Sequence, residues 1–331
     1  MIITFRCFSW KEDVMKKRYL LPVLLLSSIC SLFIGVSEVT LSGLLRMDEG
    51  QWQILFTSRL PRLMSILIAG IGMSVCGLIM QQLTRNRFVS PTTAGTLDSG
   101  RLGILVSMIL FTSAGPIEKI FVAFLFALAG TFIFMMLLER IKFKDPIFIP
   151  LVGLMFGSII SSITTFFAYR YDLIQNMSAW LQGNFALMIK GQYELLYISI
   201  PVLILAYVFA NRFTVAGMGE EFAVNLGLKY KQVVNLGLVI VALVTSVVVL
   251  TVGMIPFLGL IIPNIVSIYK GDNLRKNLPY TALLGALFVL LCDIIGRVII
   301  YPYEIAIGLT VGVVGSAIFL YMLLRRHKYG F

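Results

Sequence analysis

Long, almost uncharged apolar stretches recur along the whole chain and constrain its fold more than any other feature. Ten of them are long enough to cross a bilayer, which takes roughly 20 apolar residues in a helix. They lie at residues 19–36, 60–82, 92–112, 117–138, 147–168, 193–210, 233–252, 254–269, 279–299 and 305–324. The runs are continuous, whereas the strands of membrane β-barrels show short alternating segments. The sequence therefore predicts an all-α polytopic membrane protein with ten transmembrane helices.

The composition excludes a soluble domain of this length. Hydrophobic residues make up 59% of the 331 residues and charged residues only 13%, and the mean hydropathy is +0.94. A soluble chain could not bury so much apolar surface in one core, whereas lipid can solvate it. The chain is therefore expected to function within a membrane.

The basic residues support this count of spans and predict an orientation. With the N-terminus inside, 19 of the 27 Lys and Arg residues fall on the cytoplasmic side, seven fall outside, and Arg101 lies at membrane depth. This bias follows the positive-inside rule. The net charge of +11 is explained by cytoplasmic Lys and Arg beside anionic membrane lipid, so no nucleic-acid partner is expected. The sequence predicts a multi-pass protein of the cytoplasmic membrane with both termini in the cytoplasm.

The predicted organisation is a single membrane domain at residues 19–325. A cytoplasmic N-terminal tail at residues 1–18 precedes it, and a cytoplasmic C-terminal tail at residues 326–331 follows it. Translation could start at Met1 or at Met15, which directly precedes a basic lead-in to the first apolar run. A cleaved signal peptide is not expected, because that run is long and lacks a small-residue cleavage site.

Several kinds of chemistry lack the residues that they need. The four cysteines, Cys7, Cys30, Cys76 and Cys292, match no zinc or redox spacing, and His327 is the one histidine. The chain contains no phosphate loop of the form GxxxxGK[ST]. We therefore expect no catalytic residues, no metal site and no cofactor. If the protein performs energised work, the energy must come from another subunit.

The first departure from plain apolar helix is the basic segment Arg59–Arg62, at the predicted outer end of a span. Pro61 is tolerated in the first turn of a helix. Arg59 and Arg62 oppose the usual charge bias, because they lie on the outer side. They could anchor the helix at lipid headgroups, since Arg snorkels readily, or dock an acidic partner. Composition alone favours anchoring.

The second departure is a polar stretch that interrupts the apolar pattern after residue 84. It contains Pro91 and Gly95 and leads to Asp98 and Arg101. Asp98 and Arg101 are three residues apart, so they can pair on one helix face. Charges at membrane depth normally face a bundle interior or an aqueous path. A structural ion pair and a pathway role are about equally favoured.

The third departure lies on the predicted inside, between the sixth and seventh spans. It reads as a short helix between glycines, with acids in the first turn, where the helix dipole favours them. Phe222, Ala223 and Leu226 would form one apolar face. Lipid-binding helices are usually basic, so a protein partner is the better hypothesis. The residues that define the segment are Gly219, Glu220, Glu221, Ala223, Leu226 and Gly227.

The fourth departure places prolines and glycines inside an apolar run. Its marked residues are Pro256, Gly259, Pro263 and Asn264. Broken helix at membrane depth persists only where it packs in protein or lines a cavity. Further on, Asp293 and Arg297 are four residues apart near the outer end of a span, a spacing that allows an ion pair.

Taken in this order, the four segments resemble the FecCD/BtuC family, the permease subunits of ABC importers for iron–siderophores, haem and vitamin B12. The resemblance covers residues 20–325 approximately. It rests on R-L-P-R at 59–62, the Gly-rich run at 70–81, the basic turn and Pro-containing stretch at 86–95, and the segments 219–227, 253–264 and 285–310. Asn264 stands where the family usually has His, and Ala306-Ile307 replaces a usual Pro before Gly308. Residues 90–103 are similar to the branch that handles catecholate siderophores.

The resemblance implies a function and a set of partners. The chain would be the permease of an ATP-driven importer that carries ferric siderophore, of catecholate type, into the cytoplasm. Its partners would be a second permease subunit (a heterodimer is favoured over a homodimer), two cytoplasmic ATPase subunits and an extracytoplasmic siderophore-binding protein or lipoprotein. Arg59, Arg62 and Arg297 would dock that binding protein, and Gly219–Gly227 would be the coupling helix for the ATPases. The resemblance also implies inverted repeats, which fit interruptions near 85–95 and 253–264.

Other functions remain as alternatives. A haem or cobalamin permease of the same family is the nearest. An ion-coupled secondary transporter would need carboxylates at depth as relays, and Asp98 and Asp293 each have a nearby Arg that can neutralise them. A channel lacks a filter-like repeat, and a membrane enzyme lacks a cluster of nucleophile and base.

Overall fold

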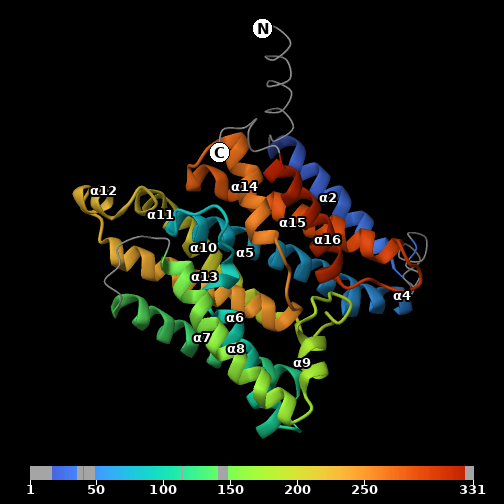
Figure 1. Cartoon of the computed structure of the whole chain (residues 1–331). Coiled ribbons are helices and arrows are strands. Elements are labelled where there is room, and N and C mark those ends of the chain that lie inside the picture. The colour runs from blue at the N-terminus through green and yellow to red at the C-terminus, as the bar shows by residue number, and fades with distance from the viewer. Residues whose placement is uncertain (1–16, 36–39, 41–48, 114, 141–147, 325–331) are drawn as a thin grey trace.

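The computed structural model describes residues 17–35, 40, 49–113, 115–140 and 148–324 (Figure 1). Over these residues the chain forms helices and turns, and the one β-type contact is an isolated bridge between Gln182 and Met254. The predicted all-α class is therefore confirmed. Most of the two predicted tails lies outside the described residues.

Each of the ten predicted spans contains a helix. These helices are α2 (Lys17–Phe33), α5 (Leu60–Leu83), α6 (Thr96–Leu110), α7 (Pro116–Arg140), α8 (Phe148–Arg170), α10 (Ser199–Val208), α13 (Tyr230–Val252), α14 (Leu258–Lys270), α15 (Leu274–Val298) and α16 (Ile307–Leu324). Among the described residues, six helices are long and apolar enough to cross a membrane unaided, and a bent pair supplies a seventh. The shorter helices α2 and α14 are apolar over 10–17 residues.

Short elements connect the spans or extend them. They are α4 (Glu49–Ile54), the π-helical turn η1 (Leu55–Arg59), the 3₁₀ turn η2 (Pro91–Ala94), α9 (Ile174–Leu181), the 3₁₀ turn η3 (Glu194–Ile198), α11 (Ala210–Ala216) and α12 (Glu220–Asn225).

The structure shifts several predicted boundaries. The span predicted at 60–82 is part of one longer helix, Glu49–Leu83. The α-helices of the spans predicted at 92–112 and 254–269 begin only at Thr96 and Leu258, because the 3₁₀ turn η2 precedes the first and the non-helical residues 253–257 precede the second. The span predicted at 193–210 bends by 60° between Val208 and Ala210. These corrections fall at interruptions that hydropathy averages over.

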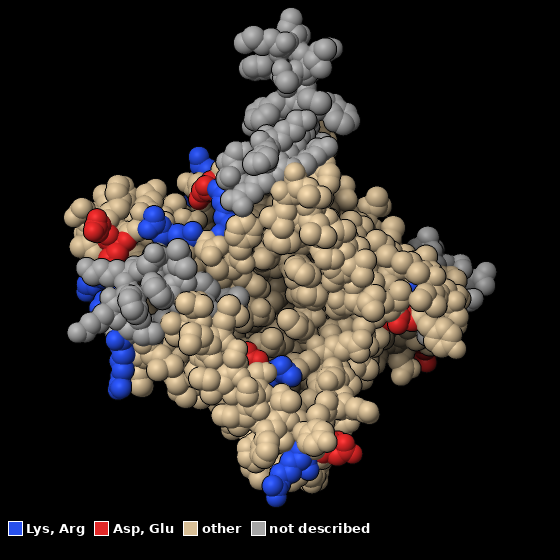
Figure 2. Space-filling view, viewed as in Figure 1, with Lys and Arg blue, Asp and Glu red and all other residues tan. Residues whose placement is uncertain are grey.

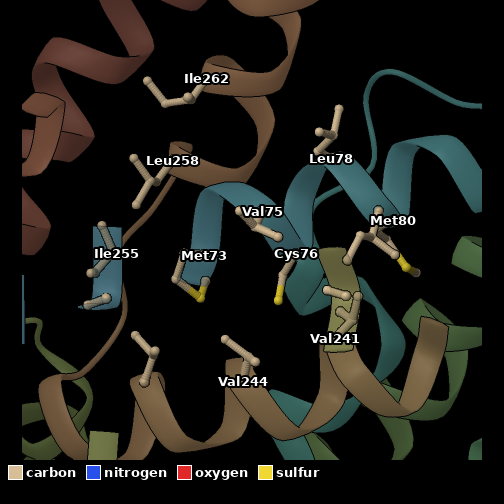
Figure 3. Close-up of a cluster of buried hydrophobic side chains, with 14 of the residues drawn as sticks. Met73, Val75, Cys76, Leu78, Met80, Val241, Val244, Ile255, Leu258 and Ile262 are labelled. Carbon is tan, nitrogen blue, oxygen red and sulfur yellow. The ribbon is translucent and has the colours of Figure 1, made fainter. Parts of the chain in front are cut away.

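Helix α5 is the centre of the bundle. In the most apolar 18-residue stretch of this helix, 83% is buried inside the protein. Helix α5 packs against α13, α14 and α15. Met73, Cys76 and Met80 of α5 lie among Val241 and Val244 of α13 and Leu258 of α14 (Figure 3). By contrast, the most apolar stretches of α8 and α16 are only 22% buried. Helix α13 is also largely buried, at 78%, so the fold surrounds these two helices with others whose outer faces are left uncovered.

Glycines set how closely these helices approach. A Cβ on Gly70 of α5 would lie 2.8 Å from the Ala286 Cα of α15, and a Cβ on Gly285 would lie 2.6 Å from the Gly70 carbonyl oxygen. Small residues allow such backbone contacts between helices in lipid. The Gly-rich run of α5 thus places α15, with its acidic and basic residues, directly against α5.

On the face drawn in Figure 2, most charged side chains lie near the edge and most of the central surface is uncharged. Helices α12 and α4 lie at opposite edges of the molecule (Figure 1). This distribution is expected of a bundle that crosses a membrane, where charges avoid the hydrocarbon region.

Candidate functional site

An ionic cluster joins α5, α15 and the turn that leads into α16. Arg62 of α5 donates from Nη2 to the Asp293 Oδ1 of α15, at 2.8 Å, and from Nη1 to Glu304 Oε2, at 2.7 Å. Arg297 of α15 forms an ion pair with the same Asp293, as the spacing of four residues predicts. One buried carboxylate therefore holds two arginines, and Glu304 adds a second acid at the edge of the cluster.

The same cluster is attached to the C-terminal end of α2. Arg297 Nη1 donates to the carbonyl oxygens of Ser31 and Ile34, both at 2.9 Å, and Arg59 Nη1 donates to the Ile34 carbonyl at 2.7 Å. Carbonyl oxygens at a helix C-terminus carry partial negative charge and attract cations. The three arginines predicted to dock a partner are thus brought together by α2, α5 and α15.

A cleft of about 410 Å³ lies beside this cluster. Arg59, Arg62 and Glu304 are among its lining residues, and Arg297 is not. Arg59 and Arg62 are each 7% exposed and Arg297 is 3% exposed, so their guanidinium groups are mostly covered in the single chain. The docking role of these arginines stays a prediction. The role of Glu304 was not predicted, because its partner Arg62 is 242 residues away along the chain.

The two polar interruptions of the apolar pattern meet inside the bundle. Asn264 Nδ2 of α14 donates to the carbonyl oxygen of Arg87, at 2.8 Å, in the turn that precedes η2. Gln81 Nε2 of α5 donates to the Leu260 carbonyl at 3.2 Å. A Cβ on Gly259 would lie 2.5 Å from Pro91 Cδ. Pro91 and Gly259, which are 168 positions apart in sequence, are therefore in direct contact, because only glycine fits beside the proline ring. Asn264 joins the same region through Arg87, which is 177 positions away.

The second interruption is shorter than predicted. Residues 253–257 are not helical, but Pro263 lies inside α14 and does not end it. The interrupted backbone finds partners in the loop after α9. The amide of Met254 donates to the Leu181 carbonyl, and the amide of Asn184 donates to the Val252 carbonyl, both at 2.9 Å. Protein therefore satisfies backbone groups that lipid could not.

Asp98 and Arg101 lie on α6, where α8 approaches closely. The nearest oxygen–nitrogen distance of this pair is 3.8 Å, and the two side chains are 23% and 32% exposed. Ser161 of α8 lies beside the Asp98 carboxylate. A Cβ on Gly157 would lie 2.5 Å from Asp98 Oδ2, so this glycine provides the space that the carboxylate occupies.

The segment predicted as a coupling helix forms α12 (Figure 1). Gly219 begins it at φ 116° and Gly227 follows it at φ 77°, conformations that glycine adopts without strain. The predicted single apolar face is wrong, because Ala223 is fully buried whereas Phe222 is 50% and Leu226 is 62% exposed. Ala223 fixes the helix to the protein, and its exposed neighbours point outward.

A second cleft, of about 310 Å³, lies between the base of α12 and the place where the two interruptions meet. Gly217 and Met218, just before α12, line it together with Gln81 of α5 and Pro263 of α14. Arg87 Nη2 closes one side by donating to both carboxylate oxygens of Asp272, at 3.1 and 2.9 Å. A movement of α12 would therefore act on the wall of this cleft.

Comparison with known proteins assigns the family. The profile of the FecCD transport family matches residues 23–325. The chain belongs to the FecCD transport family. The resemblance predicted from the motifs is thereby confirmed, and so is the prediction of a transport permease rather than an enzyme.

Relatives of this FecCD chain match it over most of their length. It is 67% identical over 315 residues to "Petrobactin import system permease protein YclN" of Bacillus subtilis, which covers 95% of this chain and 100% of the relative. It is 42% identical over 298 residues to "Ferric-anguibactin transport system permease protein FatD" of Vibrio anguillarum, which covers 90% of this chain and 95% of the relative.

A solved structure of a metal-chelate type ABC transporter in an inward-facing conformation shares the fold of this FecCD chain. The TM-score is 0.82 at 24% identity, over 92% of this chain and 97% of the solved one. At that identity the likeness shows a shared fold and not a particular substrate.

Proposed function

We propose that this chain is a membrane-spanning permease subunit of an ATP-driven importer that carries a ferric siderophore into the cytoplasm. The observation that carries this proposal is the 67% identity to a petrobactin import permease over its full length. A second relative, at 38% identity over 306 residues, is a petrobactin import permease of Bacillus anthracis. Petrobactin is therefore the first substrate to test, and the catecholate type of siderophore stays a prediction.

The geometry supports a division of labour between two ends of the bundle. Helix α12 presents Phe222 and Leu226 at one edge, which suits contact with a cytoplasmic ATPase subunit. The arginine cluster and its cleft suit contact with acidic groups of an extracytoplasmic binding protein. Two ATPase subunits and one such binding protein or lipoprotein complete the proposed importer, together with a second permease.

The placement of the chain in the cytoplasmic membrane follows from its apolar helices and its family. We propose that both termini and α12 face the cytoplasm. The support is the 19 basic residues that this orientation places inside, against seven outside. Accessibility of cysteines introduced next to Lys190 and Arg212 to a membrane-impermeant reagent tests the orientation, since only the former should react in intact cells.

The function is tested by iron uptake in a bacterial strain that lacks this chain. Complementation with the intact chain should restore uptake of radiolabelled ferric petrobactin. Replacing the ATPase subunit by a variant that cannot hydrolyse ATP should abolish that uptake. Haem and cobalamin serve as parallel substrates for the alternative permeases of the same family. Uptake of haem or cobalamin alone, or uptake driven by an ion gradient without the ATPase, would contradict the proposal.

A further inference from the structure

Charged and hydroxyl side chains lie where α6 meets α8, although polar groups are unfavourable on a helix surface that faces lipid. Only 22% of the most apolar stretch of α8 is buried, so most of this helix is open to its surroundings. Three hydroxyl side chains, Ser158, Ser162 and Thr165, are exposed on it. A shallow cleft of about 600 Å³ on this face is lined by Ser158, Ser161, Ser162, Thr165, Phe166 and Tyr169. Figure 2 shows an acidic and a basic side chain side by side amid uncharged surface, over the region of α6 and α8 in Figure 1.

Ser161 connects this cleft to the ion pair of α6. It lines the cleft and lies beside Asp98, which also fits closely against Gly157 of the same helix. Ser158 and Ser162 donate to main-chain carbonyls one turn earlier, both at 2.8 Å. Their protons are therefore used within α8, and their oxygen atoms still have lone pairs that can accept hydrogen bonds from water or a hydrated ligand.

Arg101 is the least satisfied member of the site. Its nearest acidic oxygen is at 3.8 Å, beyond hydrogen-bond distance, and its buried Nε has no partner within the described residues. A guanidinium group has five N–H donors in a fork that fits carboxylates and other paired anionic oxygens. Asp98, by contrast, lies beside Ser161 and fits closely against Gly157.

The depth of the site excludes lipid headgroups as the expected anion. Ser161 lies nine residues from Arg170 and thirteen from Phe148, the two ends of α8. At 1.5 Å per residue, it is about 13 Å from the nearer end. A charged pair at such depth normally faces other protein or an aqueous path.

We propose that Arg101 and the hydroxyl-lined face of α8 form a binding site for an anionic, oxygen-rich metal chelate during its passage through the membrane. This inference rests on the proposed function and adds the chemistry of the substrate and a residue that selects for it. Asp98 holds Arg101 in place while the site is empty, and anionic oxygens of the chelate replace Asp98 as the nearest partner of the guanidinium group.

The test uses the complete importer, reconstituted in liposomes with its ATPase, its second permease and a saturating amount of binding protein, and ferric petrobactin as the probe. Arg101→Gln should lower uptake by at least about tenfold, since a desolvated charged partner is lost. Asp98→Asn should change uptake by less than about threefold, because the guanidinium group remains. Arg170→Gln, at the exposed end of α8, is the matched control and should transport at the wild-type rate.

A charge-swapped variant, Asp98→Arg with Arg101→Asp, separates the ligand site from a structural ion pair. It keeps one charge of each sign on the same helix turn, so a structural role predicts that uptake is restored. The proposal predicts that uptake stays low although the complex co-purifies with its partners. The inference is overturned if the swap restores uptake, if Asp98→Asn is as damaging as Arg101→Gln, or if Arg101→Gln has no effect. If wild-type importer takes up no ferric petrobactin, the proposed function fails instead.

Discussion

Asp293 shows at the residue scale how a charge is kept inside an apolar bundle. Its side chain is 4% exposed and contacts both Arg62 and Arg297. Removing one partner from a buried ionic group typically costs about 3–5 kcal/mol, because charge is left uncompensated. We expect Asp293→Asn to lower the unfolding temperature of the detergent-solubilised chain and its yield in membranes.

Asp272→Asn is the control for this prediction. Asp272 pairs with Arg87, but the two side chains are 64% and 41% exposed. Exposed pairs contribute about 0–1 kcal/mol, so this variant should unfold near the wild-type temperature. Equal unfolding temperatures for the two variants would show that the buried cluster does not stabilise the fold.

Arg59 offers a cleaner test of binding-protein docking than Arg62. Reversing the charge of Arg62 would place three acidic groups together, because Asp293 and Glu304 are already its partners. Arg59→Gln leaves those two bonds in place and removes one positive charge from the cleft. We expect it to weaken binding of the binding protein to the nanodisc-embedded importer by about tenfold at low salt, and less at high salt.

The control for docking is Lys119→Gln, which removes a positive charge predicted to lie on the same outer side but away from the cleft. Its affinity for the binding protein should equal that of the wild type. A salt dependence of binding that is unchanged in Arg59→Gln would argue against electrostatic docking at this cleft.

At this scale the sequence predicts local pairs and misses distant ones. Asp293 and Arg297 are one helical turn apart, so their ion pair could be read from spacing alone. Arg62 and Glu304 lie on segments that only the packing of α5 against α15 brings together, through Gly70 and Gly285. Spacing contains no information on such a contact.

At the element scale, the orientation of α12 separates its anchoring residue from its contact residues. Ala223 is fully buried, whereas Phe222 and Leu226 are exposed. We expect Phe222→Ser with Leu226→Ser to lose the apolar contact with the ATPase, so that the ATPase no longer co-purifies with the permease. The permease itself should keep its unfolding temperature, because neither side chain packs in the bundle.

Ala223→Arg should behave differently. A large charged side chain in a fully buried position disturbs the attachment of α12, so the unfolding temperature should fall as well. Normal iron uptake by the Phe222→Ser, Leu226→Ser variant would contradict the proposed coupling role of α12. Exchange of Glu221, exposed on the same helix, for Gln serves as a control for general changes in this segment.

The elements themselves were predictable where a proline or glycine marks a turn, and less so where a helix continues through one. The basic segment at 59–62 suggests the start of a span, yet Glu49–Leu83 is one long helix. The π-helical turn η1 explains this, because the Leu60 amide donates to Leu55, five residues back. Such a wider turn relieves the clash that Pro61 would cause in a regular helix. Hydropathy does not report this kind of adjustment.

At the scale of the whole molecule, the single chain leaves a polar face of α8 uncovered, so it does not by itself enclose a translocation path through a membrane. The most apolar stretches of α8 and α16 are only 22% buried, and α8 presents hydroxyl groups beside the partly exposed ion pair of Asp98 and Arg101. Polar groups at membrane depth need protein or water next to them. We expect a second permease subunit to cover this face, with the translocation path between the two chains.

The composition of that pair decides the last prediction. A heterodimer with a related permease is expected, so the chain purified with its ATPase and binding protein but without that permease should not take up ferric petrobactin. Adding the related permease should restore uptake and give a complex whose native mass contains one copy of each. A cysteine at Ser162, on the hydroxyl-lined face, should then cross-link to the related permease, whereas one at Lys229, beside α13, should not. Transport by two copies of this chain alone would instead make the site symmetric, with Arg101 present on both sides of the path.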